Sequence, residues 1–126
     1  MDYFKKLGDF IKANGVACEH VRFGRSCHSV KEAAGAVGAD TEDFVKNVCL
    51  EDEACNIVVA IVKGEDRASR QNAAQAAGVS KLRVASPERV LEKTGFPAGG
   101  TPSFGYAAKF LVDERVLEKE FVWTGG

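Results

Sequence analysis

The segment Gly95-Phe96-Pro97-Ala98-Gly99-Gly100-Thr101-Pro102-Ser103-Phe104-Gly105 organises the rest of the chain. It holds four of the thirteen glycines and two of the three prolines of the sequence. Glycine permits positive φ and a close approach of the backbone to a ligand, and proline restricts the backbone between the glycines. Phe96 and Phe104 can anchor the segment to a core. The composition predicts either a shaped loop whose amides line a small pocket or an ordinary tight connection.

A lysine on the same strand face as two aliphatic residues favours the pocket. If Phe44–Leu50 is a strand, Lys46, Val48 and Leu50 share one face. Lys46 either lies at the start of the strand and reaches water, or points into a cleft as a fixed cation for a phosphate or carbonyl. In the second case we expect its side chain within about 10 Å of the Gly99–Pro102 backbone, across a cleft of ordinary ligand size.

The central element is predicted at Ile57–Val62, an unbroken apolar run that is β-branched at five of six positions. Such a run is typical of a strand buried on both faces. Together with the patterns around it, the run indicates one mixed α/β or α+β domain over residues 1–126, with a central, partly antiparallel sheet. Helices are expected over 2–14, 69–77 and 87–94 and from the Ser29–Glu32 capping box to 37, with a helical turn at 41–43 and further strands at 16–23, 82–85, 110–112 and 120–123.

Composition and charge exclude several classes of protein. A chain of 126 residues that is 45% hydrophobic and 28% charged fits one globular domain. It has no apolar run near the roughly 20 residues of a membrane span, and its first residues are not a signal peptide, so we expect a cytoplasmic protein. A net charge of −1 argues against binding to a long nucleic acid through many phosphate contacts, but it permits recognition of a short end of a nucleic acid.

The cysteines and histidines predict neither a metal site nor a nucleophile. The pairs Cys18/His20 and Cys27/His28 match no common zinc-binding spacing, so no metal or other cofactor is expected. A cysteine–histidine nucleophile has equally little support, because two histidines and four cysteines approach one another by chance in any small domain. Without an export signal, the thiols are expected to be reduced.

An ordered set of motifs resembles a known family. The motifs are Val45-Lys46-Asn47-Val48, Ile57–Val62, Gly64-Glu65-Asp66-Arg67, Leu82–Glu88, Thr94–Pro97 and Gly99–Gly105. In this order, over about Ser29 to Trp123, they resemble the YbaK/ProX family of aminoacyl-tRNA editing domains, related to the insertion domain of bacterial prolyl-tRNA synthetase. The resemblance implies hydrolysis of mischarged tRNA, with Cys-tRNA(Pro) and Ala-tRNA(Pro) the commonest substrates. It also implies a glycine loop that faces the strand carrying the lysine.

The resemblance also implies which residues act. When the motifs of the family are matched to this sequence, its catalytic positions correspond to Lys46 and to Gly100 or its neighbour Gly99, with Gly100 preferred. Asn47 follows the lysine, as in members that favour alanine, whereas members that favour cysteine usually have threonine there. The substrate-binding positions are expected to be Asn47, Gly99, Thr101, Pro102, Ser103 and Arg67.

Hydrolysis at this site would need a polarised carbonyl and a nucleophile. Amides of Gly99–Ser103 can stabilise the oxyanion, and Lys46 can hold the terminal ribose or phosphate or support the oxyanion. We expect water, assisted by the 2′-OH or amine of the substrate, as nucleophile, or the thiol of a cysteinyl substrate. Small residues such as Ala98 and Val48 would exclude proline by size.

The end of the sequence leaves other functions open. The family usually continues past its final glycine-rich strand with a further segment, whereas this sequence reads Gly125-Gly126 at that point, so the domain is expected to lack the extension. Two alternatives follow, a non-catalytic domain that binds a tRNA end or a synthetase and a hydrolase for an unrelated small ester. Prolyl-tRNA synthetase is an expected partner in the editing interpretation.

Overall fold

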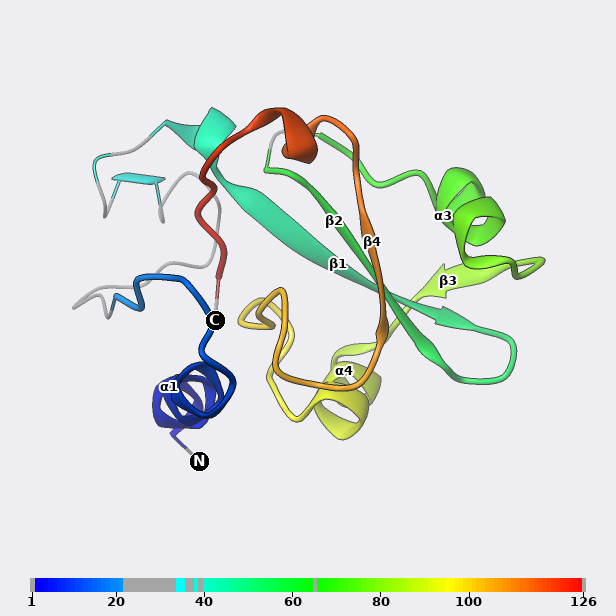
Figure 1. Cartoon of the computed structure of the whole chain (residues 1–126). Helices are drawn as coiled ribbons and strands as arrows, with labels where there is room; N and C mark the ends of the chain where they lie inside the picture. The colour runs from blue at the N-terminus through cyan, green and yellow to red at the C-terminus, as the bar shows by residue number, and fades with distance from the viewer. Residues whose placement is uncertain (1, 22–33, 36–37, 39, 65, 126) are drawn as a thin grey trace.

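The core of the protein is a four-stranded mixed sheet. It is seen in a computed structural model that describes residues 2–21, 34–35, 38, 40–64 and 66–125 (Figure 1). The strands are β1 (Val45–Asp52), β2 (Ile57–Lys63), β3 (Leu82–Val84) and β4 (Lys109–Val112), in the order β3-β1-β2-β4. β1 is antiparallel to both β2 and β3, and β4 is parallel to β2. The predicted α+β fold with a partly antiparallel sheet is confirmed.

β2 is the central strand that the sequence predicts, and all of its residues are buried. Its two faces belong to two hydrophobic clusters. Val59 and Ile61 pack in one cluster with Val90 of α4, whereas Val58 and Ala60 pack in the other with the alanines of α3. Helices therefore cover both faces of the sheet, and burial of this apolar strand is a main contribution to stability.

The helices begin and end where their capping residues predict. They are α1 (Tyr3–Asn14), α3 (Arg70–Ala77) and α4 (Pro87–Thr94). Side chains of Asp2, Ser69 and Ser86 each accept a hydrogen bond from a first-turn amide, and a glycine in the left-handed conformation ends each helix. None of the helices in the described part of the chain is long and apolar enough to cross a bilayer.

Two predicted strands are wrong in the part of the chain that the structure describes. Residues 16–21 have no strand, although they alternate loosely, because no neighbouring strand pairs with them. At 120–123 there is only an isolated bridge between Phe44 and Trp123. Main-chain hydrogen bonds of Trp123 to Asp43 and Val45 (both 2.8 Å) still hold the C-terminal segment beside the start of β1. The predicted turn at Thr41–Asp43 is a 3₁₀ helix, and the Ser29–Glu32 capping box lies outside the described residues.

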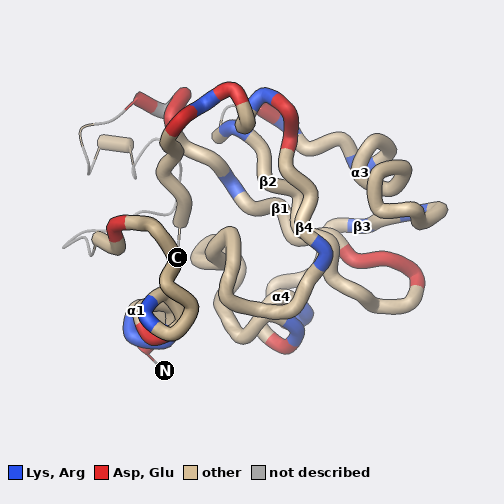
Figure 2. Tube along the Cα trace, in the orientation of Figure 1, with Lys and Arg blue, Asp and Glu red and all other residues tan. Residues whose placement is uncertain are grey.

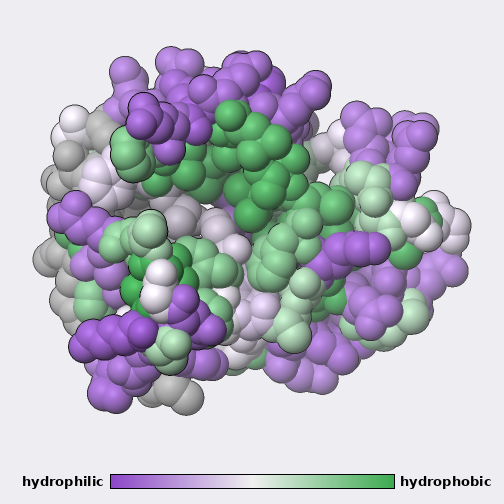
Figure 3. Space-filling view, in the orientation of Figure 1, coloured by the Kyte–Doolittle hydropathy of each residue, from purple (hydrophilic) through white to green (hydrophobic). Residues whose placement is uncertain are grey.

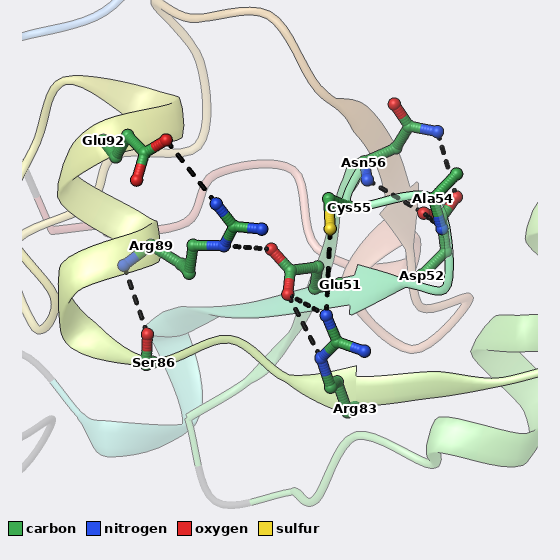
Figure 4. A network of polar contacts seen from close by, with 9 residues as sticks. All are labelled: Glu51, Asp52, Ala54, Cys55, Asn56, Arg83, Ser86, Arg89 and Glu92. Atoms are coloured by element: carbon green, nitrogen blue, oxygen red, sulfur yellow. Dashed lines mark hydrogen bonds and ion pairs between the residues drawn. The ribbon is translucent and has the colours of Figure 1, made fainter.

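A buried carboxylate connects β1 with β3 and α4 (Figure 4). Glu51 of β1 is only 2% exposed. Arg83 of β3 donates two hydrogen bonds to its Oε1, and Arg89 Nε of α4 lies 3.1 Å from its Oε2. The network fixes the position of α4, and with it the start of the segment that follows Gly95.

Candidate functional site

Residues 95–105 form a shaped loop held by its own hydrogen bonds. The amide of Gly100 and the hydroxyl of Thr101 both donate to the carbonyl of Pro97, at 3.0 and 2.9 Å. Tyr106 Oη donates to the carbonyl of Pro102 at 2.6 Å, and burial raises the pKa of this phenol. Phe96 is 1% exposed and anchors the loop in the core. The loop therefore has a defined shape, held by its own hydrogen bonds and by the buried Phe96 ring.

Helix α1 packs against this loop. Lys6 Nζ donates to the Gly95 carbonyl at 2.9 Å and lies 4.7 Å from the centre of the Phe96 ring, and the rings of Phe10 and Phe104 are 5.9 Å apart. Gly95 has φ +78°, and a Cβ there would collide with Lys6 Nζ. The left-handed conformation of Gly95 therefore favours glycine at the start of the loop, and a larger residue there would also displace the Lys6 ammonium group.

The loop meets β1 at Asn47. Asn47 Nδ2 donates to the carbonyl of Thr101 at 2.9 Å and to Thr124 Oγ1 at 3.1 Å. Ser103 Oγ donates to Asn47 Oδ1 at 2.7 Å, and the hydroxyls of Ser103 and Thr124 are also 2.7 Å apart. Three segments distant in sequence, namely β1, the glycine-rich loop and the C-terminal segment, are therefore joined in one half-buried polar cluster.

The strand geometry shows which β1 side chain faces the loop. Asn47 faces the loop, whereas Val48 and Leu50 pack on the opposite face of the sheet. The pairing of β1 with β2 is continuous from Val45 to Glu51, so side chains alternate and the Cβ of Lys46 points to the face of Val48. Asn47, not Lys46, is therefore the β1 residue that contacts the loop. A role for Lys46 in the site stays a prediction.

The other predicted residues are only partly brought together. Thr101 and Ser103 contact Asn47, and Pro102 lines the cavity described below. Arg67 is exposed in the connection between β2 and α3, and its role stays a prediction. The expected exclusion of proline by Ala98 and Val48 is not supported, because Ala98 is exposed and Val48 packs on the α3 side.

A cavity of about 500 Å³ lies beside the cluster. Its apolar wall includes Leu7 and Ile11 of α1, Phe104 of the loop and Trp123. Its polar lining includes Glu19, His20, Glu120 and Thr124. Figure 3 shows apolar and polar side chains side by side on the face that presents α1 and the loop. The volume falls in the range of sites for small ligands.

The thiol and the hydroxyl that lie against the loop, those of Cys49 and Ser103, are not activated nucleophiles. Cys49 is buried beneath the loop, and this burial raises the pKa of its thiol. The partner of the Ser103 hydroxyl is an amide oxygen, which is not a general base. His20 lines the cavity with its ring stacked on Phe4, at 3.8 Å between ring centres. Cys27 and His28 lie outside the described residues.

Thr124 is the residue of this site that sequence reasoning misses. It lies 77 residues from Asn47 in the chain and beyond the last predicted strand. It is followed by two glycines and belongs to no recognisable motif. The main-chain pairing of Trp123 with residues 43–45 brings the Thr124 hydroxyl to the loop, and no spacing in the sequence indicates that contact.

Comparison with known proteins identifies relatives of most of the chain. A family model described as "Aminoacyl-tRNA editing domain" matches residues 25–126. The uncharacterized protein YwhH of Bacillus subtilis (strain 168) is 29% identical over 85 residues, which are 68% of this chain and 54% of YwhH. The match thus spans about half the length of that relative.

Two solved structures share the fold. The hypothetical protein APE2540 is 28% identical with a TM-score of 0.85, and the match covers 96% of this chain and 81% of that one. A protein described as a candidate trans-editing enzyme for prolyl tRNA synthetase is 30% identical, also with a TM-score of 0.85, and the match covers 98% and 79% of the two chains. The cluster, the loop and β1 all lie in the segment matched by the family model.

Proposed function

Because the chain belongs to the aminoacyl-tRNA editing domain family, we propose that it hydrolyses the ester bond between a wrongly attached amino acid and the 3′-terminal adenosine of tRNA. The observation that carries this proposal is the junction of Asn47 with the glycine-rich loop, next to a cavity of suitable size. The aminoacyl group would enter the cavity, and the terminal adenosine would lie along the loop.

The finer proposal concerns the substrate. Asn47 occupies the position at which family members that favour alanine carry asparagine, and one structural relative is described as acting for prolyl tRNA synthetase. We therefore assign Ala-tRNA(Pro) as the first substrate to test and Cys-tRNA(Pro) as the second. Prolyl-tRNA synthetase, in the cytoplasm, is the corresponding proposed partner.

The loop supplies candidate donors for the oxyanion. The Gly100 amide is already bonded to Pro97, whereas the amides of Thr101 and Ser103 have no acceptor among the described residues. They can donate to the carbonyl oxygen as it gains negative charge, and such a donor is typically worth about 3 kcal/mol. Water attacks the carbonyl carbon, the bond to the ribose oxygen breaks, and that oxygen takes up the proton. The products are the free amino acid and tRNA with its hydroxyl restored.

Lys46 has a different role in this arrangement. Because its Cβ points away from Asn47, its ammonium is poorly placed to reach the reacting carbonyl inside the cavity. Among the described strands β3 pairs only with residues 50–52 of β1, so Lys46 lies at the edge of the sheet. A long flexible lysine at an edge suits a phosphate or ribose of the tRNA end.

Replacing Lys46 with alanine should lower kcat/KM for deacylation by about 10- to 1000-fold, mainly through a higher KM, because a contact to the tRNA end is lost. Lys46→Arg should retain part of the activity, since it keeps the charge. The matched control is Lys81→Ala, which removes an exposed lysine before β3. Steady-state kinetics on Ala-tRNA(Pro) measures the effect, and full activity in Lys46→Ala would remove this residue from the site.

The affinity of the protein for tRNA should depend only weakly on salt concentration. Figure 2 shows lysines and arginines interspersed with acidic residues, with no single basic stripe. With about two or three phosphate contacts, log affinity should fall with log salt at a slope of about −1.5 to −2. Salt titration of binding to a non-hydrolysable aminoacyl-tRNA analogue and to its isolated 3′ end measures this slope. A slope steeper than about −5 would contradict recognition of the end alone.

The direct test of the proposed function is deacylation of a panel of tRNAs by the purified protein. Ala-tRNA(Pro) and Cys-tRNA(Pro) should lose their amino acid, and correctly charged Pro-tRNA(Pro) should persist. Binding of these tRNAs without turnover would instead indicate a domain that recognises the tRNA end. Absence of both turnover and binding would overturn the proposal.

A further inference from the structure

In the polar cluster at Asn47, the partners of each group determine which atom donates and which accepts in every hydrogen bond. The carbonyl of Thr101 can only accept, so the amide nitrogen of Asn47 must face it, and Oδ1 must face Ser103. Ser103 then has to donate to Oδ1, which leaves Thr124 as the donor in the contact between the two hydroxyls. Thr124 Oγ1 accepts the second N–H of Asn47.

The three side chains therefore form a closed ring of hydrogen bonds. Ser103 donates to Asn47, Asn47 donates to Thr124, and Thr124 donates to Ser103. A contact of Thr124 Oγ1 with the Gly125 carbonyl is 3.5 Å long and too weak to compete with the 2.7 Å bond to Ser103. Bonds in such a ring polarise one another, which stabilises this arrangement.

The ring has free acceptor positions and no free donor. Each of its oxygens has a lone pair left, whereas every N–H and O–H is used. It can therefore bind a group that donates hydrogen bonds, and it cannot stabilise a carbonyl oxygen or an oxyanion. In an aminoacyl-adenosine ester the donors near the scissile bond are the α-ammonium group and the ribose 2′-OH.

The charges of the adjoining cavity favour the ammonium group. Thr124 is the ring residue that lines the cavity, and two carboxylates, Glu19 and Glu120, line it as well. No lysine or arginine belongs to the lining among the described residues. The indole of Trp123 is part of the same wall, and the face of an indole attracts cations. A positive donor fits this surface better than a neutral hydroxyl does.

The geometry points to the ring of Asn47, Ser103 and Thr124 as the recognition site for the free α-ammonium group of the aminoacyl ester. This inference rests on the proposed function and deepens it. It makes Thr124 a specificity-determining residue. It also predicts a substrate class, because aminoacyl-tRNAs with a free amine are accepted, and esters whose amine is acylated, such as N-acylated or peptidyl forms, are rejected.

The test compares Ala-tRNA(Pro) with N-acetyl-Ala-tRNA(Pro), which has the same ester and the same tRNA. Acetylation removes the positive charge and all but one donor, so wild-type kcat/KM should fall by about 100-fold. Thr124→Val should lower the rate on the free-amine substrate by about 10-fold more than the rate on the acetylated substrate, so that the ratio of the two rates becomes smaller. Thr124→Ser keeps a hydroxyl at this position, so it should retain the preference for the free-amine substrate. Ser80→Val, at an exposed serine, is the matched control.

A binding measurement separates this inference from the proposed function. A 3′-alanylamino-adenosine analogue, which cannot be hydrolysed as an ester, is titrated with its amine free and acetylated. Preference for the free amine that weakens in Thr124→Val supports the inference, even if no tRNA is deacylated and the proposed activity fails. Equal binding of the two forms, equal hydrolysis of the two esters, or a Thr124→Val variant that loses both activities equally would overturn it.

Discussion

Asn47→Ala is expected to reduce kcat/KM for deacylation by about 100- to 1000-fold. The substitution removes the donor to the Thr101 carbonyl and the acceptor for Ser103 by which β1 holds the loop, together with the donor to Thr124. The loop amides that we assign to the oxyanion would then lose their fixed position, and a misplacement of about 1 Å can cost about 100-fold in rate. Asn47→Asp should be similarly impaired, because a carboxylate has no N–H for the Thr101 carbonyl.

The measurement is single-turnover deacylation of Ala-tRNA(Pro), with thermal unfolding as a check that each variant is folded. Asn72→Ala is the matched control, since Asn72 is exposed on α3 and far from the loop in the fold. Activity of Asn47→Ala within about threefold of wild type would show that the junction between β1 and the loop does not contribute to catalysis.

The largest loss of stability is expected when Arg83 and Arg89 are both replaced by alanine. The carboxylate of Glu51 would stay in its buried place on β1 without a compensating charge. Uncompensated buried charges are strongly destabilising, and the midpoint of thermal unfolding should fall by roughly 10 °C or more. Thermal unfolding followed by circular dichroism measures the shift.

The rescue variant for this pair is Glu51→Gln in the double-alanine background. A neutral amide costs less to bury than a carboxylate, so part of the lost stability should return. The control Arg70→Ala removes an exposed arginine of α3 and should have almost no effect. A midpoint that is unchanged in the double variant would show that the network in Figure 4 does not stabilise the packing of α4.

Local features of the fold could be predicted from the sequence because their causes are local. Ser69 and Ser86 cap helices through amides three residues away, and Gly78 and Gly95 end the same helices. The apolar run at Ile57–Val62 determines a central strand in any packing arrangement. The sequence also predicts that Phe96 anchors the loop, because it is a large apolar residue within a segment of glycines and prolines.

The site could be predicted only in part, because its geometry depends on contacts between distant segments. The pattern of β1 shows that Lys46 and Asn47 face opposite ways, but not which face the loop covers. That choice is made where Thr101 and Ser103 meet Asn47 in the folded chain. The same limit explains why Thr124 was missed and why residues 16–21, which alternate without a partner strand, were wrongly predicted as a strand.

The position of α1 has a consequence for how such a domain diversifies. The family model begins at residue 25, yet α1 supplies Leu7 and Ile11 to the cavity wall. The polar ring and the loop, in contrast, come wholly from the matched segment. Part of the cavity wall proposed to contact the amino-acid side chain therefore comes from outside the matched segment, whereas Phe104 and Trp123 of the same wall come from within it. If the proposed function holds, exchanging the first fifteen residues between homologues is expected to change the side-chain specificity while the loop and the polar ring stay the same.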